Sequence, residues 1–189
     1  MLDTRLELEP TRVVEPILGW RTWALSGSSG GGDLRLLPIG RHGAPWPPRT
    51  PAEADCRRRR AHGEPPAPDC RCGLHATHLP GPLRQARDPA VLGRVALWGR
   101  VIEHERGYRA RYAYPQRLRL VCPLCLWRSG PAPPQACEVV VRHRGGRMVP
   151  FCTADLELSE RYGYPIRRRL DAAAVEAELL SGYAVDLLP

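Results

Sequence analysis

The chain lacks lysine and asparagine altogether, and its 189 residues include only one phenylalanine and two methionines. Arginine therefore supplies all 28 strongly basic side chains, and proline, glycine and alanine are abundant. This composition is typical of a very GC-rich coding sequence, which accounts for part of the net charge of +8 that would otherwise indicate an anionic partner. Without a lysine, the glycines of SGSSGGGD (residues 26–33) cannot complete a phosphate-binding loop and indicate a flexible turn.

Long apolar runs are also missing, and none approaches the ~18 residues that a membrane span requires. The N-terminal sequence MLDTRLELEP carries acidic residues where a secretory signal has a basic start and an apolar core. We therefore expect a cytoplasmic protein with no membrane partner. Thiols stay reduced in that compartment, so the seven cysteines are predicted to be metal ligands or free thiols rather than disulfides.

The spacing of apolar residues and turns predicts a mainly β (α+β) fold, in which antiparallel hairpins form a small sheet or barrel. Residues 13–25 and 34–40 are predicted as two strands. Residues 93–121 are predicted as a long hairpin, with a kink at Gly99 and the end of its second strand at Pro115.

The C-terminal third is predicted to form a second hairpin and one helix. The hairpin covers CEVVVRH and MVPFC (residues 137–143 and 148–152), and the helix covers residues 170–183, with Asp171 as N-cap and Gly182 as its stop. This divides the chain into a β-rich core (1–121) with a Pro/Arg-rich loop (41–68), and a Cys-rich hairpin with the helix (122–189). We expect both parts to pack as one unit.

Cys122 and Cys125 are separated by two residues at the end of the apolar run LRLV, and three interpretations of the pair compete. A redox pair needs a helix N-terminus to lower the thiol pKa, and the glycine and prolines of residues 130–134 are expected to prevent such a helix. Two buried core cysteines are the plainer alternative. We favour a structural zinc, because two thiolates at this spacing converge on one tetrahedral ion in a zinc-ribbon-like part.

Two more zinc ligands are then required, and the preferred set has four sulfurs, from Cys122, Cys125, Cys137 and Cys152. Asp155 is the alternative fourth ligand, because Cys152 and Asp155 repeat the two-residue spacing after a strand. Four protein ligands would make a closed site that contributes to folding and leaves no catalytic position.

A less regular group of possible donors lies upstream, at Cys56, His62, Cys70, Cys72, His75 and His78. A weaker second metal site is predicted from four of these residues, Cys56, Cys70, Cys72 and His75. The alternative is a crossing of loops in which small thiols and imidazoles fill the gaps between prolines.

Arginines near aromatic residues are the candidate nucleic-acid contacts. The first are four consecutive side chains, Arg57, Arg58, Arg59 and Arg60, although so short a run is commonly just a solvated surface. In YRARYAYP (residues 108–115) the tyrosines share one strand face, and Arg109 and Arg111 share the other. An exposed tyrosine face would stack bases while the arginines guide the backbone; a tyrosine face packed on the core is the alternative that we favour.

The segments GWRTWAL, CRCGLHA and LWGRVIEHERGYRARYAYP together resemble a family of uncharacterised bacterial proteins that is common in high-GC actinobacteria. The resemblance spans residues 16–189 and implies a bacterial, cytosolic origin but no activity. Members of that family carry Cys-x-x-His near the second hairpin, whereas this chain has CTAD, with Asp155 in the place of the histidine. This difference leaves the fourth zinc ligand open.

The predicted function is a zinc-stabilised binding module, whose partner is nucleic acid or a protein in a nucleic-acid complex. One alternative is a thiol- or metal-dependent enzyme, which needs a Cys–His contact in a concave site. The other is a protein-binding adaptor that uses exposed tryptophans. The sequence identifies no small-molecule substrate.

Overall fold

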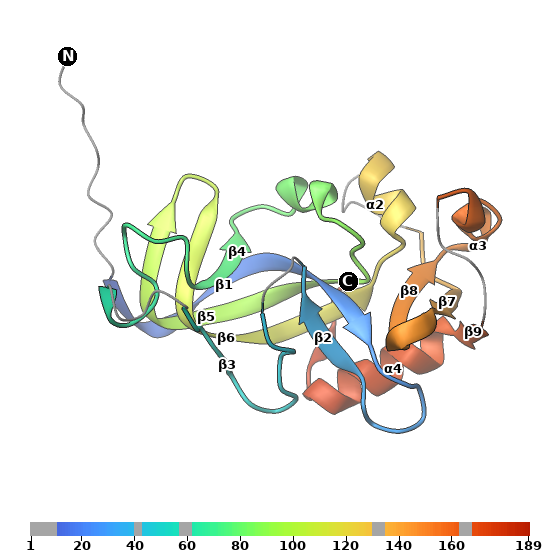
Figure 1. Cartoon of the computed structure of the whole chain (residues 1–189), viewed down its shortest axis with the longest axis horizontal. Coiled ribbons are helices and arrows are strands. Elements are labelled where there is room, and N and C mark those ends of the chain that lie inside the picture. The colour runs from blue at the N-terminus through green and yellow to red at the C-terminus, as the bar shows by residue number, and fades with distance from the viewer. Residues whose placement is uncertain (1–10, 40–42, 57–61, 130–134, 163–167) are drawn as a thin grey trace, which may run out of the picture.

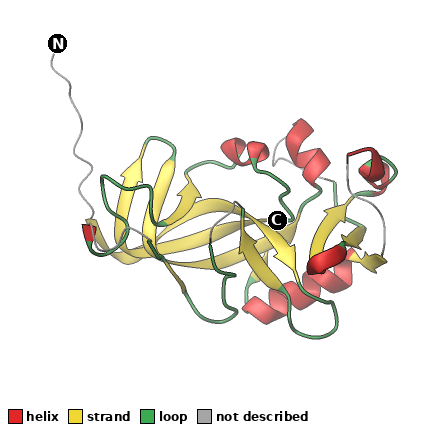
Figure 2. Ribbon diagram, viewed as in Figure 1, coloured by secondary structure: helices red, strands yellow, loops and turns green. Residues whose placement is uncertain are grey.

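The computed structural model describes residues 11–39, 43–56, 62–129, 135–162 and 168–189. Strands dominate these residues (Figure 2), which confirms the mainly β prediction. In chain order the strands are β1 (Thr11–Ser26), β2 (Arg35–Pro38), β3 (Ala52–Glu53), β4 (Leu74–Thr77), β5 (Val91–His104), β6 (Gly107–Leu120), β7 (Val139–Arg142), β8 (Arg147–Phe151), β9 (Arg168–Asp171) and β10 (Asp186–Leu187). The helices are α2 (Pro123–Ser129), α3 (Thr153–Leu156) and α4 (Ala172–Tyr183), with 3-10 turns η1 (Gly81–Gln85), η2 (Arg144–Gly146) and η3 (Ser159–Tyr162).

The long strands β1, β5 and β6 run side by side through the middle of the molecule (Figure 1). β5 pairs with β1 on one side and with β6 on the other, and the short β4 pairs with both β6 and β1. The pairing therefore returns to β1, so the sheet closes on itself as in a small barrel. β8, β7 and β9 continue from β1, which joins the Cys-rich part to the same hydrogen-bonded sheet.

The predicted hairpin over residues 93–121 is confirmed as β5 and β6. Gly99 has a φ of +77° at a register shift that follows Trp98, so the predicted kink is a β-bulge at a position that favours glycine. The predicted end at Pro115 is wrong, because β6 continues beyond it. Pro115 pairs with Val95 at a second register shift, where the ladder is irregular and a missing N–H is tolerated.

Aromatic side chains fasten the Pro-rich loop to the barrel. Trp46 is only 2% exposed, pairs with Leu36 and meets the ring of Trp23 edge-on at a centroid distance of 5.2 Å. The Tyr183 hydroxyl donates to the Trp46 carbonyl at 2.7 Å and accepts from the Leu36 N–H at 2.9 Å. The loop is therefore anchored to the barrel at Trp46.

The second hairpin is confirmed as β7 and β8, and the C-terminal helix as α4. Asp171 caps α4 as predicted, because its carboxylate accepts from the Ala174 N–H at 2.9 Å. Gly182 is not the stop, since the helix runs to Tyr183 and ends where Ala184 adopts a φ of +51°.

Replacing Asp171 with alanine should lower the free energy of unfolding by about 1 kcal/mol, since the Ala174 N–H loses its capping acceptor. Chemical denaturation monitored by circular dichroism measures the difference. Asp186→Ala, at an exposed position of β10, is the control and should change stability little. Equal effects of the two substitutions would contradict the cap.

Two apolar clusters make up most of the interior. The larger one fills the barrel and includes Trp23, Leu97 and Leu118, with Val175 and Leu179 of α4 packed against it. The smaller one surrounds three cysteines and is built from Cys122, Leu124, Cys125, Val141, Val149, Phe151, Cys152 and Leu156. No helix in the described part of the chain is long and apolar enough to cross a membrane.

Candidate metal centres

The structure brings together Cys122, Cys125, Cys152 and Asp155, which we call the buried cluster. Cys122 immediately precedes α2 and Cys125 lies in its first turn, whereas Cys152 is the N-cap of α3 and Asp155 lies within it. Two helix starts thus face each other, each with two donors at a spacing of three. The four donor atoms lie within 4.8 Å of one another, and all four residues are buried.

The distances within the buried cluster match a tetrahedral metal site. Cys125 Sγ lies 3.6 Å from Cys152 Sγ. Two thiolates on one tetrahedral zinc, each with a Zn–S bond of about 2.3 Å, would lie about 3.8 Å apart. Asp155 Oδ2 lies 3.2, 3.1 and 3.4 Å from the sulfurs of its three neighbours, Cys122, Cys125 and Cys152.

Asp155 is held in place by Arg128. The Arg128 guanidinium donates to Oδ1, which leaves Oδ2 directed at the three sulfurs. The Asp155 side chain is only 1% exposed, and a carboxylate so deeply buried needs a cation or hydrogen-bond donors around it. A neighbour that orients a ligating carboxylate through its other oxygen is typical of protein metal sites.

The acid–base properties of these thiols argue against a redox pair. Burial raises the pKa of Cys122 to about 12 and also raises the pKa of Cys125. Burial alone would raise the pKa of Asp155, but hydrogen bonds from the thiols and Arg128 bring it below its usual value. Attacking thiols of redox pairs have a lowered pKa, whereas thiols such as these lose their protons when a cation binds.

The structure corrects one step of the sequence argument. No helix was expected after Cys122, yet α2 follows it directly and ends at Ser129. The glycine and prolines of residues 130–134 come after that end and do not interfere with it. Because this helix is present, the sequence-based reason for rejecting a redox pair does not hold. The raised pKa values of Cys122 and Cys125 are the reason to reject it.

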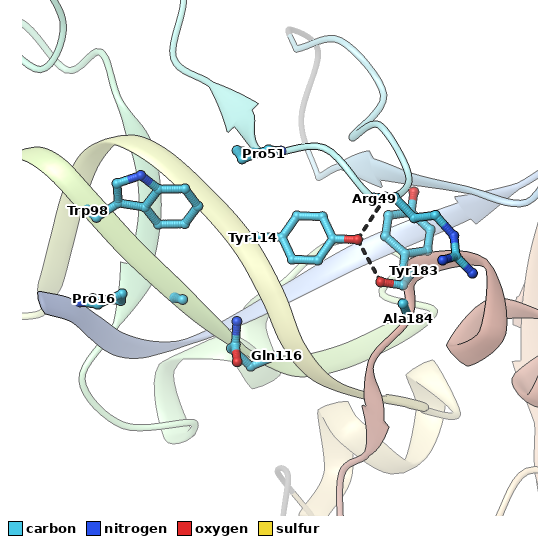
Figure 3. A pocket seen from close by; sticks show the side chains of 9 residues that line it. Pro16, Arg49, Pro51, Trp98, Tyr114, Gln116, Tyr183 and Ala184 are labelled. Atoms are coloured by element: carbon cyan, nitrogen blue, oxygen red, sulfur yellow. Dashed lines mark hydrogen bonds between the residues drawn. The ribbon is translucent and has the colours of Figure 1, made fainter.

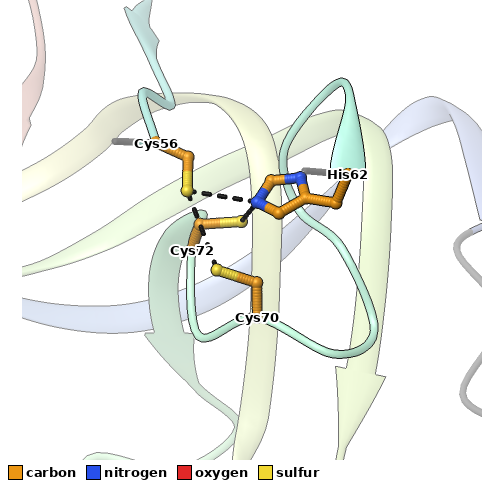
Figure 4. A group of neighbouring side chains, drawn as sticks. All are labelled: Cys56, His62, Cys70 and Cys72. Carbon is orange, nitrogen blue, oxygen red and sulfur yellow. Dashed lines mark hydrogen bonds between the residues drawn. The ribbon is translucent and has the colours of Figure 1, made fainter. Parts of the chain in front are cut away.

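A second group, Cys56, His62, Cys70 and Cys72, forms what we call the loop cluster (Figure 4). Figure 4 shows the three thiols and the imidazole of His62 pointing toward one another. His62 Nε2 lies 3.2 Å from Cys56 Sγ and 3.7 Å from Cys72 Sγ. Cys56 Sγ lies 3.7 Å from Cys70 Sγ, close to the sulfur–sulfur distance of about 3.8 Å in a tetrahedral zinc site.

The loop cluster is less enclosed than the buried cluster, and its thiols differ in acidity. All four side chains are partly exposed. Hydrogen bonding from the Cys72 backbone lowers the pKa of Cys70 to about 7, whereas burial raises the pKa of Cys72 to about 11. Cys70 therefore supplies a thiolate near neutral pH, as metal binding requires.

Arg109 holds the backbone of the loop cluster. Its guanidinium donates to the carbonyl of Ala67 at 3.1 Å, to that of Cys72 at 3.3 Å and to that of Cys70. The side chain comes from β6, and the residue is 8% exposed. Arg109 is thus buried and hydrogen-bonded inside the protein, whereas the sequence analysis placed it among the surface contacts to nucleic acid.

The other predicted ligands lie outside the two clusters. Cys137 is partly buried and packs against both apolar clusters, but it is not among the grouped donors, so Asp155 takes the fourth position. His75 Nε2 lies 2.9 Å from the Arg71 carbonyl, and His62 occupies the place that was predicted for His75. His78 pairs with Glu103 at 3.1 Å.

Five arginines remain among the predicted nucleic-acid contacts. Arg57, Arg58, Arg59 and Arg60 lie outside the described residues. Arg111 forms ion pairs with Glu53 at 3.2 Å and Glu64 at 2.5 Å, and it covers the ring of Tyr112 at 4.9 Å. Its charge is therefore balanced within the protein.

Comparison with protein-family models, with curated proteins and with solved structures finds no match to this chain. The resemblance to actinobacterial proteins stays a prediction.

Proposed function

We propose that the protein is a zinc-stabilised binding module for nucleic acid, with one structural zinc ion in each cluster. The convergence of four donor atoms within 4.8 Å in each cluster is the observation that carries this proposal. Each cluster offers three sulfurs and one further donor, an imidazole nitrogen or a carboxylate oxygen. Sulfur-rich tetrahedral sets favour zinc over magnesium or calcium, which prefer oxygen.

A structural role fits the position of both clusters in the chain. The loop cluster ties the Pro-rich segment after β3 to the segment that leads into β4, and the buried cluster ties α2 to α3. Each cluster therefore joins two segments that are separate in the sequence. Four protein donors close a zinc site and leave no open position for a substrate, as in known structural sites.

The alternative of a thiol enzyme receives less support from the geometry. Cys56 and His62 are in contact, but two further thiols share the same imidazole, whereas a nucleophile–base pair needs only one. The neighbouring cavity of about 470 Å³ is lined by neither Cys56 nor His62. A metal site explains the convergence of three thiols more directly.

The choice of nucleic acid as partner rests on charge and on an arginine–aromatic pair. The chain carries a net charge of +8. Arg94 of β5 covers the ring of Trp20 of β1 at 5.0 Å, and both residues are partly exposed, so a cationic and an aromatic side chain lie together on neighbouring strands. Surfaces of this kind bind single-stranded nucleic acids through phosphate attraction and base stacking.

Elemental mass spectrometry of untagged protein is expected to find about two zinc ions per chain. Six of the seven cysteines belong to the two clusters, so thiol reagents should find six of them protected before chelation and reactive after it. Chelation should also unfold the protein, because zinc binding contributes to folding. Metal-free protein that is folded and has seven reactive thiols would overturn the proposal.

The partner is tested separately by fluorescence anisotropy with a labelled single-stranded oligonucleotide. The dissociation constant should rise steeply with salt, because each phosphate contact releases counterions. Absence of binding at low salt, or a dissociation constant that does not change with salt, would reject nucleic acid as the partner. The proposal of two zinc sites would not be affected by either result.

A further inference from the structure

An aromatic cleft lies on the barrel, and neither cluster contributes a residue to it. It has a volume of about 660 Å³, within the range of small-molecule sites (Figure 3). Ala96 and Trp98 of β5 and Tyr114 and Gln116 of β6 lie along one face of the paired strands. The cleft is lined by Pro16, Arg49, Pro51, Ala96, Trp98, Tyr114, Gln116, Tyr183 and Ala184.

Hydrogen bonds hold the cleft in one shape. The Tyr114 hydroxyl accepts from the backbone N–H of Arg49 at 2.8 Å and donates to the Tyr183 carbonyl at 2.6 Å (Figure 3). The Arg49 side chain donates to the Ser181 carbonyl at 3.0 Å. One tyrosine thus joins the Pro-rich loop to the end of α4, and the aromatic wall is fixed before any ligand arrives.

The backbone is strained at two positions on the rim of this cleft. Arg49 has a φ of +56° and Ala184 a φ of +51°, and in the described chain only Asp88 shares this feature among non-glycine residues. Residues with side chains rarely adopt this conformation, and such outliers gather at binding sites. Two of these three residues line the cleft, one in the Pro-rich loop and one at the end of α4.

The chemistry of the lining selects a planar, anionic ligand. None of the nine lining residues is acidic, and Arg49 is the charged one. Trp98 stacks on Tyr112 with the rings 27° from parallel, so its indole is held by a second aromatic ring. The Gln116 amide, which is exposed, can both donate and accept hydrogen bonds.

We propose that this cleft binds one nucleotide of a single-stranded nucleic acid, which specifies the site of the proposed function and rests on it. The base stacks against Trp98 and Tyr114, Gln116 bonds to the base edge, and Arg49 pairs with a phosphate. Figure 3 shows Tyr114 between Trp98 and Arg49. The ring that would stack on the base and the guanidinium that would bind the phosphate are therefore apart, as the base and the phosphate of a nucleotide are.

The test is anisotropy titration of labelled oligo(dT) of about ten nucleotides, a length within the site sizes of single-strand binders. Trp98→Ala should weaken binding by about tenfold or more, which corresponds to the loss of one base–aromatic stack. Arg49→Gln should weaken binding and reduce the salt dependence by one phosphate contact. Trp98→Phe keeps a stacking ring and should retain most of the affinity.

Matched controls are Trp127→Ala and Arg168→Gln, which alter exposed residues on α2 and β9, away from the cleft. Zinc content and circular dichroism verify that every variant is folded. If the wild-type protein binds the oligonucleotide and Trp98→Ala and Arg49→Gln bind it as strongly as the control variants do, the cleft is not the nucleotide site. The proposal of a nucleic-acid-binding module would not be affected by that result.

A titration with uridine monophosphate separates the two proposals further. A shift of the Trp98 indole NMR signal that Arg49→Gln weakens supports a nucleotide in the cleft. If no oligonucleotide binds, the cleft takes a free nucleotide only, and both the proposed partner and the single-strand assignment are rejected. No shift, or a shift with a proline-rich peptide alone, overturns the nucleotide assignment.

Discussion

Replacing Asp155 with alanine is expected to remove the zinc ion of the buried cluster and to destabilise the protein by several kcal/mol, since structural zinc contributes about 10–16 kcal/mol to folding in small zinc domains. Asp155 supplies the one oxygen donor among three sulfurs, and its side chain is almost fully buried. Without it, the three thiols of Cys122, Cys125 and Cys152 would have to hold the ion alone. Metal analysis should show about one zinc per chain instead of two, and chemical denaturation should show the loss of stability.

Cys137→Ser is the matched control for this prediction, because Cys137 belongs to the four-sulfur set preferred from the sequence and lies near the buried cluster without joining its donors. This variant should keep both zinc ions. The reverse outcome, in which Cys137→Ser loses an ion and Asp155→Ala keeps it, would restore the four-sulfur set and show that the side chain of Asp155 only accepts hydrogen bonds from the thiols.

The parts of the fold that were predictable are those specified by local patterns. The β5–β6 hairpin follows from alternation and α4 from its cap at Asp171, and both are local in the sequence. β4, β9 and β10 have four residues or fewer and are strands only because distant segments pair with them. α2 was missed because the prolines after residue 130 were given weight inside a helix that ends before them.

The candidate sites were predictable to the same degree. The Cys-x-x-Cys pair and the equal spacing of Cys152 and Asp155 identify the buried cluster, because each pair lies in one helical turn. His62 could not be preferred over His75 from spacing, since the loop that brings His62 to the thiols has no regular period. The strained lining of the aromatic cleft, at Arg49 and Ala184, has no signal in the sequence because neither residue is glycine or asparagine.

Arg109 shows why a strand pattern does not determine exposure. Alternation assigned Arg109 and Arg111 to one face, and that face was expected to meet solvent or phosphate. β4 pairs with β6 across Arg109, with His75 opposite it, and the segment before β4 folds over its guanidinium. The closure of the barrel, a long-range event, thus buries one arginine and leaves the other in surface ion pairs.

Arg109→Met should remove the zinc ion of the loop cluster while the buried cluster keeps its own. The carbonyls of Cys70 and Cys72 would lose this donor, whereas that of Ala67 would keep the Cys70 N–H. An acceptor left unsatisfied costs about 1–3 kcal/mol when it is buried. We therefore expect a loss of about 2 kcal/mol in the free energy of unfolding, measured by chemical denaturation, and a fall of one zinc per chain.

Arg111→Met is the control for this last prediction, because it removes the same side chain two residues along the same strand. Its ion pairs with Glu53 and Glu64 involve partly exposed side chains, and such pairs contribute little to stability. Both zinc ions should therefore remain in Arg111→Met. Equal zinc loss in the two variants would mean that general destabilisation of β6 releases the metal, whereas loss in Arg109→Met alone assigns to Arg109 the positioning of the loop cluster.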